Sequence, residues 1–126
     1  MIRSLAFNLY FYFGTLLTAV VGIVLVPIPT PILLRGLLHH WARAFVWGMH
    51  WIGGMKVEFR GLPHLPTTGP ALLAGKHQSE CDGILLAAQI HGIAFVAMQE
   101  LFSYPLIGSI LYRLQMIRVD ACGGGK

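Results

Sequence analysis

Residues 71–83 read Ala-Leu-Leu-Ala-Gly-Lys-His-Gln-Ser-Glu-Cys-Asp-Gly, an apolar run that leads directly into a polar segment. The run at 71–75 predicts a short buried strand, and Asp82 stands where a helix begins, because carboxylates are favoured at helix N-termini. On one continuous helix, His77 and Asp82 would point about 140° apart. Across a turn they can meet. The stretch therefore predicts a strand, a turn that carries His77 and Asp82, and a helix.

His77 and Asp82 are candidate catalytic residues. A neutral imidazole that is held by a carboxylate can take a proton from a hydroxyl group. Cys81 offers an alternative, in which its thiol is the nucleophile and His77 the base, but we favour the interpretation of Cys81 as a small structural residue at a helix start. Glu80 and Glu100 carry carboxylates as well, but neither has a histidine or a second carboxylate at a useful spacing.

Three linked segments extend this pattern along the chain. They are Gly75-Lys76-His77-Gln78-Ser79 with Asp82, then Gln99-Glu100-Leu101 followed by Pro105, Ile107 and Gly108, and then Gln115-Met116-Ile117-Arg118-Val119-Asp120. Their order and gaps resemble the glycerolipid acyltransferase family, whose bacterial members include 1-acylglycerol-3-phosphate acyltransferases. The resemblance covers residues 55 to 121.

The resemblance implies transfer of a fatty acyl group from acyl-CoA or acyl carrier protein to the free hydroxyl of a lysophospholipid. For 1-acylglycerol-3-phosphate the product is phosphatidic acid, a step of phospholipid biosynthesis. His77 would be the general base, and Asp82 would hold its tautomer and stabilise the imidazolium. The thiolate leaves readily, so no metal or other cofactor is expected. Glu100 and Arg118 are the candidate substrate-binding residues, the latter because arginines suit phosphate recognition.

One departure from the family pattern concerns the end of the chain. Ala121 stands where the family has an arginine, and Arg118 lies two residues before Asp120, on the same strand face. The family's later Glu-Gly-Thr-Arg block does not follow. We therefore expect the first half of an acyltransferase, very weak or inactive as written. The alternatives are a non-catalytic fragment and a membrane-anchored interaction protein without chemistry of its own.

The composition is that of a membrane protein. Hydrophobic residues make up 56% of the chain and charged residues 11%, against about a quarter charged in soluble domains. The net charge of +4 comes from scattered basic residues without an aromatic stacking platform, which argues against nucleic acid and for anionic lipid headgroups. Two cysteines are too few for a disulfide framework and fit a reducing compartment.

The first 54 residues predict a membrane anchor. Residues 5–26 carry no charge and would form a helix of about 33 Å, which matches a bilayer core. A secretory signal is the alternative, but no Ala-x-Ala cleavage site follows. A second, interfacial helix should follow residues 27–31, which contain three prolines. Its apolar face has helical spacing and consists of Leu34, Leu38, Trp41, Phe45, Met49 and Ile52.

Polar residues of the second helix fall on another face, namely Arg35, His39, Arg43 and His50. We interpret His39, His40 and His50 as a polar face at headgroup level, not as metal ligands, because no cysteine or carboxylate lies near them at ligand spacing.

Residues 55–126 predict a partial acyltransferase domain of α/β class, with strands and helices in layers. Strands are expected at 55–60, 71–75, 93–98 and 116–120, and helices at 82–91 and 106–114, with residues 61–70 as a loop and Gly92 as a C-cap. The resemblance places this domain on the cytoplasmic side of the bacterial inner membrane.

Overall fold

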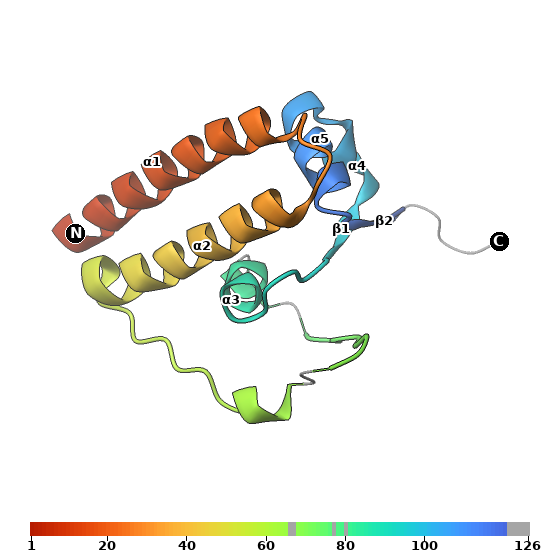
Figure 1. Cartoon of the computed structure of the whole chain (residues 1–126). Helices are drawn as coiled ribbons and strands as arrows, with labels where there is room; N and C mark the ends of the chain where they lie inside the picture. The colour runs from red at the N-terminus through yellow and green to blue at the C-terminus, as the bar shows by residue number, and fades with distance from the viewer. Residues whose placement is uncertain (66–67, 77, 80, 121–126) are drawn as a thin grey trace.

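The computed structural model describes residues 1–65, 68–76, 78–79 and 81–120. Two long helices, α1 (Ile2–Leu25) and α2 (Ile32–Gly48), form an antiparallel hairpin, and a π-helical turn, η1 (Met49–Gly53), extends the second (Figure 1). Aromatic side chains of the two helices pack against each other. The ring of Phe45 packs edge-on against that of Phe11, with centroids 5.1 Å apart, and its centroid lies 5.6 Å from that of Phe7. Tyr10 also donates a hydrogen bond to the carbonyl oxygen of Ala44 at 2.8 Å.

The open end of the hairpin is closed by an arginine. Arg3 donates from Nε to the carbonyl oxygen of Ile52 at 3.2 Å and from Nη2 to that of Trp51 at 3.4 Å. Gly54 ends η1 with a φ of +74°, the left-handed conformation that favours glycine. A Cβ atom at Gly54 would lie 2.8 Å from Cζ of Arg3, so the glycine also makes room for the guanidinium.

One face of α1 is covered by the rest of the protein and the other is apolar and exposed. Among the residues that the structure describes, α1 is the one helix long and apolar enough to cross a membrane. Gly22 is its only buried residue. The exposed large side chains recur at helical spacing and are Ile2, Leu5, Leu9, Tyr12, Phe13, Leu16, Leu17, Val20, Val21 and Val24.

Helix α3 (Cys81–Gln89) packs across α2 through small residues. Ala42, Ala87 and Ala88 are buried at this contact, and short side chains let the two helices approach closely. The larger side chains around them are Leu38, Trp41, Val46, Ile84, Ile93 and Phe95. The helix expected at 82–91 is thus confirmed, and Gly92 follows it with a φ of +76°.

The last part of the described chain is a parallel β-α-β unit. Strand β1 (Val96–Met98) pairs in register with β2 (Ile117–Val119), so that Ala97 lies opposite Arg118. The crossover contains α4 (Gln99–Ser103) and α5 (Pro105–Arg113). Gly108 packs against the backbone of Phe102, where no side chain would fit, and α5 lies against α1.

Two predicted strands are wrong. Residues 55–60 and 71–75 form no strand, and Leu72 is 90% exposed. Val57 and Phe59 are half-buried between exposed charged residues, so the alternation that predicted the first strand is present. A strand, however, also needs a neighbour for its backbone groups, and the described residues pair only β1 with β2.

The described structure is therefore mostly helical, with a short two-stranded parallel sheet. The predicted strands at 93–98 and 116–120 are confirmed in shorter form, and α5 confirms the helix at 106–114. The loop at 61–70 contains a 3₁₀ turn, η2 (Leu62–His64), and α4 was not expected. The division at residue 54 into an anchor and an acyltransferase domain stays a prediction.

Candidate active site

The chain wraps around the carboxylate of Asp82 just before α3. Oδ2 of Asp82 accepts hydrogen bonds from the backbone N–H groups of Gln78 at 2.7 Å and of Ser79 at 2.9 Å. Oγ of Ser79 in turn accepts the N–H of Cys81 at 3.2 Å. The N–H of Asp82 donates to the carbonyl oxygen of Ser79 at 3.0 Å. These bonds fix where the turn ends and the helix begins.

This arrangement has the reciprocal bonds of a capping box. A serine hydroxyl satisfies a free N–H of the first helical turn, and an acidic side chain three residues later binds the N–H of that serine. The position of Asp82 in the first turn of α3 agrees with the sequence prediction. The role of Ser79 was missed, although the spacing Ser-x-x-Asp is a recognised signal for a helix start.

Several predictions fall on residues outside the described part of the chain. His77, Glu80 and Ala121 are among them, so the pairing of His77 with Asp82 stays a prediction. Cys81 is described and half-buried. Its alternative role as a nucleophile is neither supported nor contradicted by its contacts.

An apolar pocket of about 430 Å³ lies beside the first turn of α3. Gly83, the residue after Asp82, is part of its wall. The polar Oγ1 of Thr15 in this wall accepts a hydrogen bond from Nε1 of Trp41 at 3.3 Å. The other lining residues come from α1, α2, α3, α5 and the segments flanking β1 and β2, and are Thr18, Ala19, Gly22, Leu34, Leu37, Leu38, Trp41, Ile84, Ala87, Phe95, Ile107, Ile110, Leu111, Leu114 and Met116.

The two candidate substrate-binding residues lie on neighbouring elements away from this turn. Glu100 is exposed in the first turn of α4, and α4 packs against β1, β2 and α5. Arg118 is exposed on β2 and donates from Nη1 to the hydroxyl of Tyr112 at 3.2 Å. Asp82, by contrast, belongs to α3, which packs on α2. Glu100 and Arg118 thus lie on two elements that contact each other, α4 and β2, and their role in substrate binding stays a prediction.

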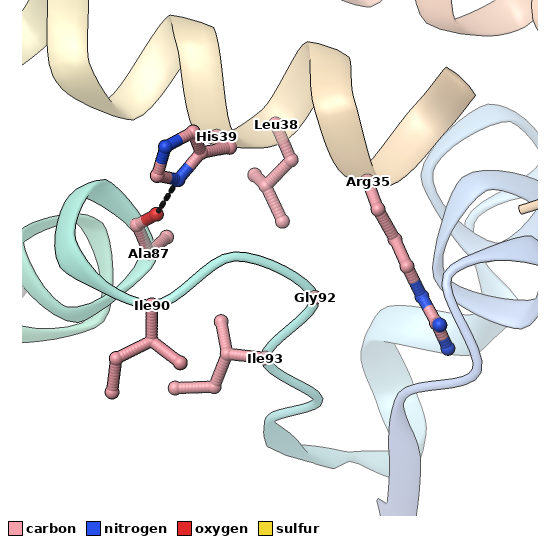
Figure 2. A pocket seen from close by; sticks show the side chains of 7 residues that line it. All are labelled: Arg35, Leu38, His39, Ala87, Ile90, Gly92 and Ile93. Carbon is pink, nitrogen blue, oxygen red and sulfur yellow. Dashed lines mark hydrogen bonds between the residues drawn. The ribbon is translucent and has the colours of Figure 1, made fainter. Parts of the chain in front are cut away.

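The sequence suggested that His39 lies on a free polar face, but in the structure this side chain contacts α3. Its Nδ1 is 2.9 Å from the carbonyl oxygen of Ala87 near the end of α3 (Figure 2). Its ring also lies 5.2 Å from that of His91. The helical pattern of α2 could not show this contact, because α3 covers this part of the face. Within the described residues, no three metal-ligating side chains come together.

Comparison with known proteins places the chain in a family. The family model Acyltransferase matches residues 56–123. A 1-acyl-sn-glycerol-3-phosphate acyltransferase of Pseudomonas aeruginosa is 29% identical over 86 residues, which are 68% of this chain and 33% of that protein. The chain therefore spans about a third of the length of this curated relative. No solved structure matches the chain. The match over more than half of the sequence confirms the resemblance seen in the motifs, and the chain belongs to the glycerolipid acyltransferase family.

Proposed function

We propose that the protein transfers a fatty acyl group from acyl-CoA or acyl carrier protein to the free hydroxyl of 1-acylglycerol-3-phosphate or a similar lysophospholipid. One observation carries this proposal: the turn organised by Asp82 adjoins an apolar pocket through Gly83. Family membership supports acyl transfer in general, and the acceptor is suggested by the name of the Pseudomonas aeruginosa relative.

In the proposed reaction His77 takes the proton of the acceptor hydroxyl, and the oxygen attacks the thioester carbonyl carbon. The new C–O bond forms as the C–S bond breaks, and the thiolate leaves and is protonated from the imidazolium. Asp82 stabilises the imidazolium and holds the tautomer of His77. No cofactor takes part, and the acyl thioester is a co-substrate.

The pocket is the proposed site of the transferred acyl chain. Its volume lies in the range of about 300–1,000 Å³ that small-molecule sites occupy. Each methylene group that leaves water for such a site contributes about 0.8 kcal/mol. A chain seated between α1, α2 and α5 would carry its carbonyl end toward the first turn of α3.

The helical hairpin is the proposed membrane anchor. The exposed face of α1 is apolar along its length, and Trp47 and Trp51 are exposed on α2 and η1. Tryptophan is enriched where proteins meet lipid headgroups. Both substrates carry lipid chains, so an anchored enzyme would meet its acceptor in the membrane. We place it at the bacterial inner membrane, with the turn before α3 on the cytoplasmic side.

The test is acyl transfer by the protein in phospholipid vesicles, with lysophosphatidic acid and an acyl thioester. We expect His77→Ala to lower the rate by roughly 10²–10⁴-fold, the usual contribution of a general base. Sedimentation with the vesicles should be unchanged. Turnover within a few-fold of the parent would contradict the role of His77. A parent that transfers no acyl group would instead favour a membrane-anchored interaction protein.

A further inference from the structure

The turn between α5 and β2 contains an unusual backbone conformation. Gln115 has a φ of +59° and is the only described residue other than glycine with a positive φ. Side chains rarely tolerate this left-handed region. The N–H of Gln115 donates to the carbonyl oxygen of Tyr112 at 3.1 Å, and that of Met116 to the carbonyl oxygen of Leu111 at 3.1 Å. Gln115 thus stands at a sharp reversal that directs the chain into β2.

The side chain of Gln115 is held from a distant part of the sequence. Nη2 of Arg35, on α2, donates a hydrogen bond to Oε1 of Gln115 across 80 positions. We call this contact the Arg35–Gln115 bridge. Figure 2 shows the Arg35 side chain extended away from His39, past the segment that contains Gly92 and Ile93. Among the described residues, Nε of Arg35 is a buried side-chain nitrogen without a hydrogen-bond partner.

The bridge lies next to the apolar pocket, whose lining includes sequence neighbours of both residues but neither Arg35 nor Gln115. Leu114 and Met116, the two neighbours of Gln115, line the pocket, and so does Leu34, the neighbour of Arg35. Leu34 and Leu114 are both buried. The bridge therefore joins two sides of the pocket, α2 and the turn before β2, at positions directly beside lining residues.

We propose that the Arg35–Gln115 bridge fixes the width of the pocket, and that Arg35 and Gln115 are positioning residues that determine which acyl chains the pocket accepts. The effect on acyl-chain selection rests on the proposed function, whereas the effect of the bridge on the pocket wall does not. Without the bridge, the strained turn is free to relax and the wall formed by Leu114 and Met116 can move away from α2.

The structural part is tested by amide hydrogen exchange in vesicles. Arg35→Met keeps most of the apolar stem and removes the donor, and we expect exchange of residues 114–119 to rise about tenfold, the scale of one lost hydrogen bond. Gln115→Glu keeps the acceptor and should leave exchange at or below the parent level. Arg43→Met removes a charge from an exposed position of α2 and is the matched control. Equal exchange in Arg35→Met and the parent would overturn the bridge.

The functional part is tested with acyl thioesters of increasing chain length. In Arg35→Met, the ratio of kcat/KM between the longest and the best donor should rise by about threefold or more, because a wider pocket discriminates less between methylene groups. Gln115→Glu and Arg43→Met should keep the parent profile. An unchanged profile in Arg35→Met would overturn the role in selection.

The failure of this inference can be told apart from failure of the proposed function. If the parent transfers no acyl group from any donor, these 126 residues do not carry out the proposed function by themselves. A fluorescent fatty acid then replaces the donors, and its affinity should change at least about threefold in Arg35→Met but not in Arg43→Met. An affinity that does not depend on Arg35 would overturn the proposal.

Discussion

Oδ2 of Asp82 accepts the backbone N–H of Ser79 at 2.9 Å, and the hydroxyl of Ser79 satisfies the N–H of Cys81. The two side chains therefore build the start of α3 together. In the family pattern, the aspartate is the proposed partner of the histidine. Here its carboxylate also binds the backbone of Gln78 and Ser79, so local folding and the proposed catalysis depend on the same group.

The hydroxyl of Ser79 should matter for both stability and turnover. Ser79→Ala leaves the N–H of Cys81 without its acceptor, and we expect the free energy of unfolding to fall by about 1 kcal/mol. Ser79→Thr keeps a hydroxyl and is the matched control. Thermal unfolding in detergent measures the effect on stability, and kcat with lysophosphatidic acid measures the effect on turnover. If Ser79→Ala matches the parent in both, the capping role is wrong.

A substitution at Gly83 can fill the pocket at the end next to Asp82, where the carbonyl end of the acyl chain is proposed to lie. A Cβ atom at Gly83 meets no described atom within 4 Å, so the backbone accepts a side chain there. Gly83→Ala should raise the free energy of unfolding by about 0.5–1 kcal/mol, because alanine is the better helix former.

Gly83→Leu, in contrast, should place a branched side chain in the pocket. We expect it to lower kcat/KM for long acyl donors more than for short ones, while Gly83→Ala serves as the control for loss of glycine. A uniform loss for all donors in Gly83→Leu would contradict the assignment of this pocket to the acyl chain.

Substitution of Gly54 is expected to be destabilising. Its φ of +74° disfavours other residues, and a Cβ atom would lie 2.8 Å from the guanidinium of Arg3, so that this flexible side chain would have to shift. Gly54→Ala should lower the free energy of unfolding by about 1–2 kcal/mol. Gly36→Ala is the control, since a Cβ atom there meets nothing within 4 Å in a regular helix. An equal melting temperature for both variants would show that the Arg3 contact does not constrain the end of the hairpin.

The exposed face of α1 should hold the protein in membranes by insertion. High salt and alkaline carbonate should not release it, because salt does not screen apolar contacts with lipid. Leu9→Arg combined with Leu16→Arg places two charges on the exposed face, each opposed by roughly 2.5–3.5 kcal/mol at the centre of a membrane helix. This variant should become extractable by carbonate, whereas Thr30→Arg in the hairpin loop should not. Release of the parent by carbonate would contradict insertion.

The features that the sequence determined by itself are local. The uncharged run at 5–26 and the prolines after it were sufficient to predict α1 and its end, because both depend on the residues concerned and not on distant partners. The start of α3 was also predictable, since a capping carboxylate acts within one turn. Gly92 has the left-handed conformation expected of a glycine after a helix, but α3 ends earlier, at Gln89, so Gly92 is not its C-cap.

Only the tertiary structure decided the features that need a partner. Residues 55–60 have an alternating pattern but no strand beside them in the described structure, and a strand exists only through its neighbour. His39 lies on the polar face of α2, yet α3 packs there and provides the carbonyl group that it contacts. The pocket is formed by four helices, and Arg35 reaches Gln115 across 80 positions. No local pattern encodes such contacts, because they arise from the way in which separate elements pack against one another.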